Sequence, residues 1–152
     1  MSYIKKTMQK DEEIRLPVKL HWINYVGAFS ILIVAFLLLI YYMIPDDYDK
    51  SDLIVIVVVV AGTAFYQFLK LWFIEMAVTN KRVVLRKGII AIDSDEIKNS
   101  KIEGIEVEQS VFGRILNYGD VCFAGVGVGK LKFSNISQPW EVKRMSDEII
   151  GE

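Results

Sequence analysis

Two long runs of apolar residues interrupt a chain whose other segments mix apolar and polar positions. The first run, residues 22–44, has 23 residues without a charged side chain, and the second, residues 53–69, has 17. At 1.5 Å per residue the first run forms a helix of about 34 Å, longer than the roughly 30 Å hydrocarbon core of a bilayer. The second run reaches a similar length if it continues to residue 73 with Lys70 extending its amine to the headgroups. The pattern predicts transmembrane helices at 22–44 and 53–73.

A polar segment, residues 45–52, separates the two runs. It begins with Pro45 and is rich in aspartate, so it predicts a turn outside the lipid that makes the two helices antiparallel. A cleaved signal peptide is the alternative for the first run, but the run is too long and no Ala-x-Ala cleavage pattern follows it. Side chains typical of membrane-interface anchors lie near the ends of the runs: His21, Trp22, Tyr41, Tyr42 and Trp72.

The chain after residue 73 follows the two-residue period of β-strands. Glu75 is placed in the first of these strands, since a carboxylate is costly in lipid. A closing helix is expected from Pro139, because Val142, Met145 and Ile149 share one helical face. Residues 110–119 predict a compact turn or one-turn helix with its apolar residues aimed inward. The expected strands are residues 73–78, 82–86, 89–93, 101–108, 120–124 and 130–133.

The predicted fold class is therefore a two-helix transmembrane hairpin followed by a small, mainly β domain over residues 74–152. Antiparallel strands that end in one amphipathic helix favour curved sheets or an open barrel capped by that helix. The first 21 residues are polar and charged and predict a juxtamembrane lead. This lead is compatible with a short helix or with a segment that lies along the membrane interface.

Composition locates the unusual hydropathy and excludes one class of partner. The hydrophobic fraction of 53% and the mean hydropathy of +0.33 are high for a soluble domain, and the excess lies in the two runs. Residues 70–152 hold 12 basic and 12 acidic side chains. A neutral domain lacks the basic face that phosphate contacts need, so no nucleic-acid partner is expected.

The distribution of positive charge predicts the topology. Five lysines and arginines precede the first run and five lie in residues 70–87, whereas the polar turn has one. Because lysine and arginine are retained on the cytoplasmic side, both termini are expected there, with the turn on the opposite side.

Few residues offer catalytic or ligand chemistry. Cys122 is the single cysteine and His21 the single histidine, so no disulfide and no Cys/His metal site can form within the chain. Cys122 lies in an apolar strand and is expected to be buried. The acidic residues of segment 95–108 indicate solvated strand faces rather than an acid–base pair. We therefore predict no enzyme activity, no metal and no cofactor.

The glycines at 125, 127 and 129 raise the possibility of a phosphate cradle. A Walker loop needs Gly-Lys-Ser/Thr before a helix, whereas Gly129-Lys130-Leu131 begins a predicted strand. These glycines therefore favour a hairpin or a bulge.

Basic residues follow the second apolar run closely. They are candidates for contact with anionic headgroups, worth about 1 kcal/mol per residue at a membrane surface. The alternative is that they retain the topology and solvate strand edges. The residues are Lys70, Lys81, Arg82, Arg86 and Lys87.

Several segments, taken in order, resemble the bacterial pleckstrin-homology-like family of membrane-flanked, YdbS-like proteins. The segments are Leu20-His21-Trp22, residues 78–83, residues 95–97 with 100–102, residues 113–121, and residues 133–136 with Pro139. The Gly-Val-Gly-Val-Gly run departs from the Gly-Thr-Gly-Gly expected for the family. The resemblance implies two sheets capped by a C-terminal helix, in a cytoplasmic domain at the bacterial inner membrane, and it does not imply an enzyme.

Together these observations predict a non-enzymatic, membrane-anchored module that acts as a protein-interaction or self-assembly scaffold. Its expected partners are membrane lipids and either further copies of the chain or another protein of a membrane complex. The alternative is a domain that senses or handles anionic lipids.

Overall fold

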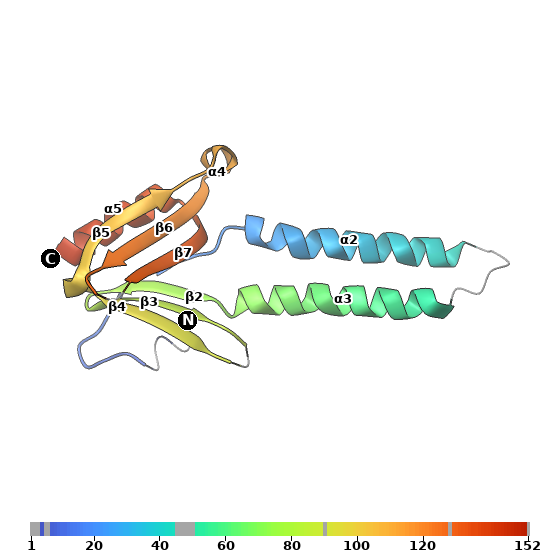
Figure 1. The fold of residues 1–152 in the computed structure, drawn as a ribbon, viewed down its shortest axis with the longest axis horizontal. Helices are drawn as coiled ribbons and strands as arrows, with labels where there is room; N and C mark the ends of the chain where they lie inside the picture. The colour runs from blue at the N-terminus through green and yellow to red at the C-terminus, as the bar shows by residue number, and fades with distance from the viewer. Residues whose placement is uncertain (1–3, 5–6, 45–50, 90, 128, 152) are drawn as a thin grey trace. The chain divides into compact units, whose positions relative to one another are not determined.

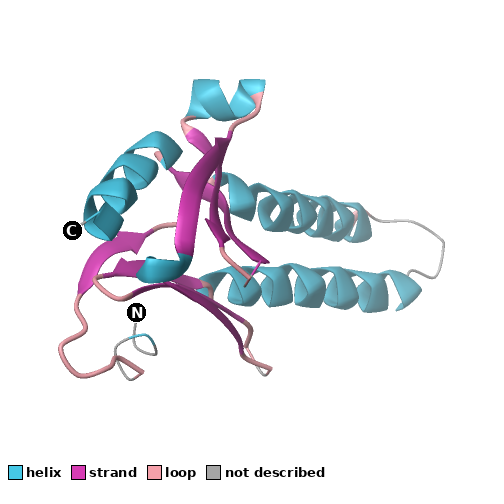
Figure 2. Cartoon of the chain, turned by 60° about the vertical axis from the view of Figure 1, so that its left-hand side comes forward, coloured by secondary structure: helices cyan, strands magenta, loops and turns pink. Residues whose placement is uncertain are grey.

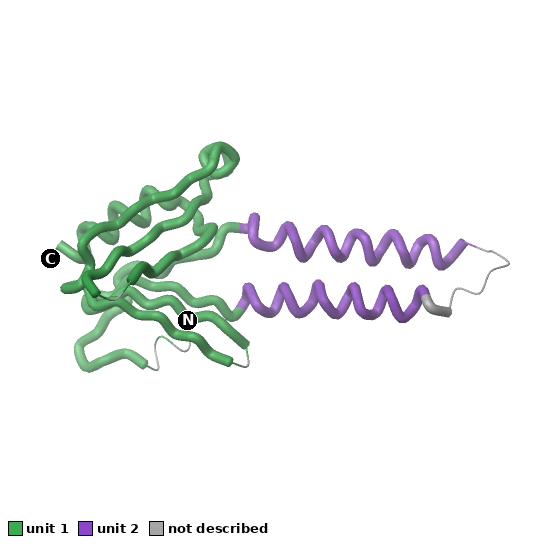
Figure 3. Tube along the Cα trace, viewed as in Figure 1, with its two compact units in different colours: residues 1–21, 73–152 green, residues 22–72 purple. Residues whose placement is uncertain are grey.

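A computed structural model describes residues 4, 7–44, 51–89, 91–127 and 129–151. The chain divides into two compact units. Residues 1–21 and 73–152 form one unit, here called the β unit, and residues 22–72 form the other, the helical unit (Figure 3).

The helical unit is a pair of long helices, α2 over Ile23–Met43 and α3 over Ser51–Trp72. Small side chains are buried within this unit, among them Ala28, Ala35 and Ala64. Small residues let two helix backbones approach closely. Most of the large apolar side chains point outward instead, and both helices are long and apolar enough to cross a membrane.

The expected helices at 22–44 and 53–73 are thus present with slightly shifted ends. Ser51 already belongs to α3, so the helix includes the last two residues of the expected turn. Residues 45–50 of that turn lie outside the described residues.

The β unit consists of two antiparallel sheets and a closing helix (Figures 1 and 2). The four-stranded sheet has the order β1 (Ile14–Val18), β2 (Glu75–Thr79), β3 (Arg82–Lys87), β4 (Asp93–Lys98). The three-stranded sheet has the order β5 (Ile102–Glu108), β6 (Tyr118–Gly125), β7 (Gly129–Ser137). A 3₁₀ turn (Asn99–Lys101) connects the sheets, α4 (Val111–Leu116) connects β5 to β6, and α5 (Pro139–Gly151) follows β7.

The core lies between the two sheets and under α5. The strands alternate, so that one face of each sheet supplies apolar side chains to the core. Phe123 and Phe133 are fully buried at its centre, with ring centroids 5.1 Å apart in an edge-to-face contact. Val142 brings α5 into the same cluster. The predicted mainly β fold with a C-terminal helix is confirmed, and the two sheets remain separate rather than closing into a barrel.

Two strands differ from the sequence prediction. Residues 14–18 form β1, neither a helix nor an interface segment. Pro17 is tolerated because β1 is an edge strand that pairs with β2 alone. The strand expected at 89–93 instead occupies Asp93–Lys98, where Ile97 is the one buried side chain. Its pairing with β3 supplies the order that this polar segment does not supply by itself.

Candidate functional site

Both connections to the helical unit leave the β unit at one end. β1 ends at Val18 and β2 begins at Glu75, and the antiparallel register places Val18 opposite Met76. The chain therefore leaves through residues 19–21 and returns through residues 73–74 beside each other. We call this end of the β unit the linker end, and the opposite end, with the β2–β3 turn, the far end.

The three-stranded sheet reaches the linker end as well. The amide of His21 donates to the carbonyl of Asn135 at 2.9 Å, and the amide of Ser137 donates to the carbonyl of Lys19 at 3.1 Å. The His21 ring stacks on Tyr118, the first residue of β6, with centroids 5.2 Å apart. The linker end thus contains the start of β6 and the end of β7.

His21 is buried, with 7% of its surface exposed, so its ring is used inside the domain. The other predicted interface residues belong to the helical unit. Trp22, Tyr41 and Trp72 are exposed and Tyr42 is half-buried. Their role as membrane anchors stays a prediction.

The β2–β3 hairpin separates the predicted headgroup contacts. In the β2–β3 register Arg86 lies opposite Glu75, the first residue of β2. Arg86 and the adjacent Lys87 therefore lie at the linker end. Lys81 and Arg82 lie at the far end. Arg82 and Lys87 are the two ends of β3, about 17 Å apart at 3.4 Å per residue. Lys70 lies in the last turn of α3. Residues that are close in sequence are therefore not brought together as one basic patch.

Arg82 is buried in an ion-pair network. Its Nε donates to Glu12 Oε1 at 3.0 Å and its Nη2 donates to Glu12 Oε2 at 3.2 Å. Its Nη1 pairs with Glu96, and the Thr79 hydroxyl donates to Glu12 Oε1 at 2.9 Å. Two carboxylates thus compensate the guanidinium.

Glu12 is held ionised by the same contacts. Burial by itself would raise the pKa of Glu12. Hydrogen bonds from the Gln9 amide, Arg82 and Thr79 outweigh burial and lower the pKa below its usual value. Arg82 therefore attaches the N-terminal segment to β3, and this geometry does not favour headgroup contact by Arg82.

Arg86 is also buried, with 9% of its surface exposed. Lys70, Lys81 and Lys87 are exposed. Among the predicted headgroup contacts in the β unit, Lys87 combines exposure with a place at the linker end. The role of Glu12 was not identified from the sequence, because its partner, Arg82, lies 70 residues further along the chain.

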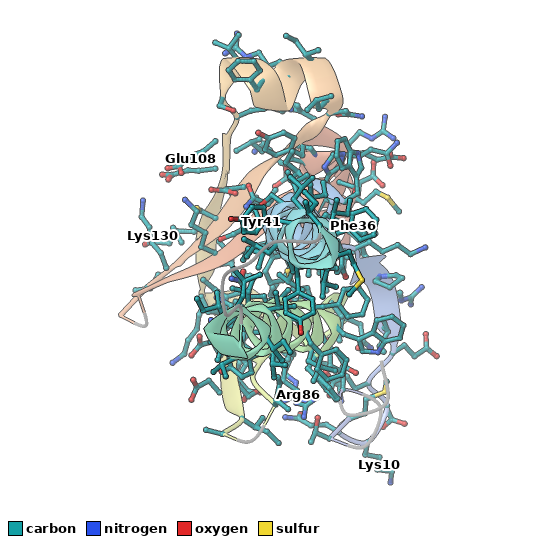
Figure 4. All side chains as sticks on the ribbon, turned by 90° about the vertical axis from the view of Figure 1, so that its right-hand side faces the viewer. Lys10, Phe36, Tyr41, Arg86, Glu108 and Lys130 are labelled. Carbon is teal, nitrogen blue, oxygen red and sulfur yellow. The ribbon has the colours of Figure 1, made fainter. Side chains whose placement is uncertain are left out.

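The outer face of the three-stranded sheet carries a ladder of paired charges. Lys130 contacts Glu106 at 3.0 Å, and Lys132 contacts Glu108 at 2.9 Å and Asp120 at 2.8 Å. Figure 4 shows Glu108 and Lys130 on the same side of this sheet. The ladder presents both signs of charge at the surface.

Cys122 lies beneath this ladder, between Glu106 and Lys132 in the strand register. It is buried, which confirms the prediction made from its apolar neighbours. Burial raises the pKa of the Cys122 thiol, and nearby Glu108 adds to the effect. The thiol is therefore protonated and shielded in the folded domain.

The glycine-rich segment joins β6 to β7, which confirms the predicted hairpin. Gly125 pairs with Gly129, and Gly127 and Gly129 have φ of 69° and 81°. Residue 128 lies outside the described residues. Within the described ranges, no group of three or more His, Cys, Asp and Glu side chains is arranged to hold a metal ion.

Helix α4 contradicts one prediction, because its apolar side chains point outward. Val111, Phe112 and Ile115 are 72%, 72% and 74% exposed. The inward position is taken by Gly113, where an added Cβ would lie 2.6 Å from the carbonyl oxygen of Tyr118. The backbone of this turn approaches β6 too closely for an apolar side chain to fit between them.

Polar groups fasten α4 to the sheet. Ser110 caps the helix by accepting a hydrogen bond from the Gly113 amide at 3.0 Å. The side-chain amide nitrogen of Gln109, Nε2, donates to the backbone carbonyls of Gly113 and Tyr118, both at 3.0 Å. Asn117, with φ of 57°, ends the helix. Gln109 and Gly113 are therefore the residues that determine which side of α4 faces out.

Antiparallel sheets of four and three strands, closed by a C-terminal helix, define a pleckstrin-homology-like fold. The family model of the bacterial PH domain matches residues 20–148, and the chain belongs to this family. The matched range includes both apolar helices, whereas β1 precedes it. Comparison with curated proteins and comparison with solved structures each gave no match.

Proposed function

We propose that the chain is a non-enzymatic, membrane-anchored PH module that presents its surface to a protein partner or to further copies of itself. The membrane is the bacterial inner membrane, and the β unit lies at its cytoplasmic face. The observation that carries the anchoring is the outward-facing apolar surface of α2 and α3, over lengths sufficient to cross a bilayer. In water such a surface would be an aggregation hazard, whereas lipid accommodates it.

Strand pairing supports a hairpin topology. β1 precedes the first helix, β2 follows the second, and the two strands pair along their length. Paired strands must lie on the same side of a membrane, so the two helices cross it in opposite directions. The basic residues that flank the helices favour the cytoplasm for that side.

The charge arrangement favours a protein partner over a headgroup pocket. Arg82 is compensated by Glu12 and Glu96, and the exposed sheet face alternates Lys130 and Lys132 with carboxylates. Anionic headgroups bind basic residues whose charge is not already compensated. A surface of both signs instead gives specificity for a protein of complementary pattern.

The scaffold proposal is tested with the full chain in nanodiscs of inner-membrane lipids. The chain is first crosslinked in cell membranes and then purified into these nanodiscs, where the mass of the particle is measured. The expected result is a defined oligomer or a fixed heteromeric partner. Charge reversal at Lys130 and Lys132 together is expected to weaken that assembly. A monomer that crosslinks to no protein in the membrane would contradict the proposal.

One observation favours the lipid-binding alternative, namely the exposed Lys87 at the linker end. Its matched control is Lys81, a second exposed lysine, which lies at the far end and donates to the carbonyl of Lys10. In native mass spectrometry from nanodiscs with phosphatidylglycerol, Lys87→Glu is expected to lose retained anionic lipid and Lys81→Glu to keep it. Equal retention in both variants would contradict lipid recognition at this end.

A further inference from the structure

Helix α4 carries the most exposed group of apolar side chains in the described part of the β unit. We call Val111, Phe112 and Ile115 the α4 apolar face; each has more than 70% of its surface exposed. Large aromatic and aliphatic side chains grouped in this way mark a surface that meets another apolar phase. The scaffold proposed above uses the charged face of the three-stranded sheet. It does not involve the α4 apolar face.

Contacts within the β unit place α4 at the linker end. Asn117 ends the helix, and the next residue, Tyr118, stacks on His21 with centroids 5.2 Å apart. His21 immediately precedes the first apolar run. Ile115 is three residues from Tyr118, so their Cα atoms lie within about 11 Å of each other. The α4 apolar face is therefore close to the point at which the chain leaves for α2.

A tryptophan extends this surface. Trp140 is 59% exposed, and its indole N–H donates to the Gln109 side-chain oxygen at 3.1 Å. The same Gln109 fastens α4 through its amide nitrogen. An exposed indole with a satisfied N–H is typical of residues at a membrane–water boundary. The side chain that holds α4 in place thus also holds an aromatic ring beside it.

Short connections keep the linker end near the lipid surface if α2 and α3 span a bilayer. Two residues, Phe73 and Ile74, separate α3 from β2. This connection spans at most about 11 Å from Trp72 to Glu75. The headgroup region on each side of the hydrocarbon core is about 5–8 Å deep, so the linker end meets it.

We propose that the α4 apolar face inserts into the headgroup–acyl boundary of the same bilayer that α2 and α3 cross. This inference rests on the proposed membrane anchoring. Interfacial helices lie in the plane of the membrane and bury their apolar face to a depth of about 5–10 Å. Arg114, exposed on α4, extends its guanidinium to the phosphates. α4 is then a third attachment point that fixes the tilt of the β unit and leaves its charged sheet faces open to the cytoplasm.

The test uses the full chain in liposomes of phosphatidylcholine and phosphatidylglycerol. A fluorophore sensitive to water, NBD, is attached at Phe112→Cys in a Cys122→Ser background, or with Cys122 retained because it is buried. The matched control is Val126→Cys. Val126 is also apolar and 55% exposed, but it follows the opposite end of β6, about 24 Å from Tyr118. Leu37→Cys, within α2, reports on the anchoring itself.

Insertion predicts a blue-shifted emission at position 112 that brominated lipids quench, with position 126 unshifted and unquenched. Quenching at 37 without quenching at 112 would overturn the α4 inference and leave the anchoring intact. Equal quenching at 112 and 126 would also overturn it, because it indicates general adsorption of the domain. A blue shift at 112 without quenching by lipid would likewise overturn it, because protein rather than lipid would then cover α4. Absence of quenching at 37 would refute the anchoring, and the α4 inference with it.

Discussion

Replacing Arg82 by methionine is expected to destabilise the β unit strongly. The variant removes the guanidinium and leaves the Glu12 carboxylate, whose side chain is 0% exposed, without its cation. Breaking a buried ion pair by removing one partner costs about 3–5 kcal/mol. Glu12 would keep its hydrogen bonds from the Gln9 amide at 2.7 Å and the Thr79 hydroxyl at 2.9 Å. We therefore expect a loss of about 3 kcal/mol, the lower end of that range.

Glu12→Gln is the matched variant from the other side of the pair. It keeps the shape of the side chain, and Arg82 retains Glu96 and the carbonyl of Thr7, to which Nη2 donates at 2.8 Å. The expected cost is about 1.5–2 kcal/mol, the lower part of the roughly 1.5–3 kcal/mol that hydrogen bonds to charged groups contribute. The double variant should cost less than the sum of the single variants, with a coupling of about 1–3 kcal/mol.

Cys122 provides the assay. It is the single cysteine and it is buried in the β unit, so labelling of its thiol by a maleimide reports unfolding of this unit without interference from the helices. The full chain is equilibrated in mild detergent with increasing urea and then labelled briefly. The midpoint is expected to fall in the order wild type, Glu12→Gln, Arg82→Met. Equal midpoints for wild type and Arg82→Met, or additive effects in the double variant, would refute the structural role of the pair.

The remaining predictions use the same assay, with a dipyridyl disulfide, which reacts with thiols at acid pH, in place of the maleimide for the pH series. Since the pKa of Glu12 is lower in the folded state than in the unfolded state, its contribution is fully present above the ordinary glutamate pKa of about 4.3 and is lost as the pH falls through the lowered value. Glu12→Gln should flatten that acid-dependent loss, and an unchanged pH profile would contradict the assignment. Phe133→Ala empties a fully buried site and should cost about 3–5 kcal/mol, whereas Val126→Ala at an exposed site should stay within about 0.5 kcal/mol. Gly113→Ala should cost about 1–3 kcal/mol through its contact with a backbone carbonyl, whereas Gly104→Ala has no atom within 4 Å of the added Cβ and should cost far less.

Strong local signals explain which elements the sequence predicts well. Both long helices follow from uninterrupted apolar runs, and α5 follows from Pro139 and a regular apolar face. The β6–β7 hairpin follows from glycines between two alternating segments. In each case the residues that determine the element lie within it or beside it, so no knowledge of distant partners is needed.

The missed features depend on partners that are remote in sequence. β1 contains a proline, which is unfavourable within a strand, and it is ordered by pairing with β2, which follows the whole helical unit in the sequence. The sequence predicts Arg82 as a surface cation, because nothing near it in the chain indicates that Glu12 lies beside it in the fold. The outward direction of α4 depends on the carbonyl of Tyr118, which excludes any side chain at position 113. Periodicity describes which residues share a face, and here the backbone of a neighbouring strand decides which face is inside.

The polar network at Arg82 also explains how a weak edge strand holds its register. β1 has three apolar positions and an irregularity between Ile14 and Leu16, so its own packing specifies the register poorly. Two hydrogen bonds link the backbone of Glu13 to Asn80, at 2.9 Å and 3.2 Å, next to the bonds from Arg82 to Glu12. These directional contacts at the far end fix the strand that leads into α2. Because β1 and β2 flank the two helices in the sequence, the four-stranded sheet is complete only when the segments before and after the helical unit pair with each other.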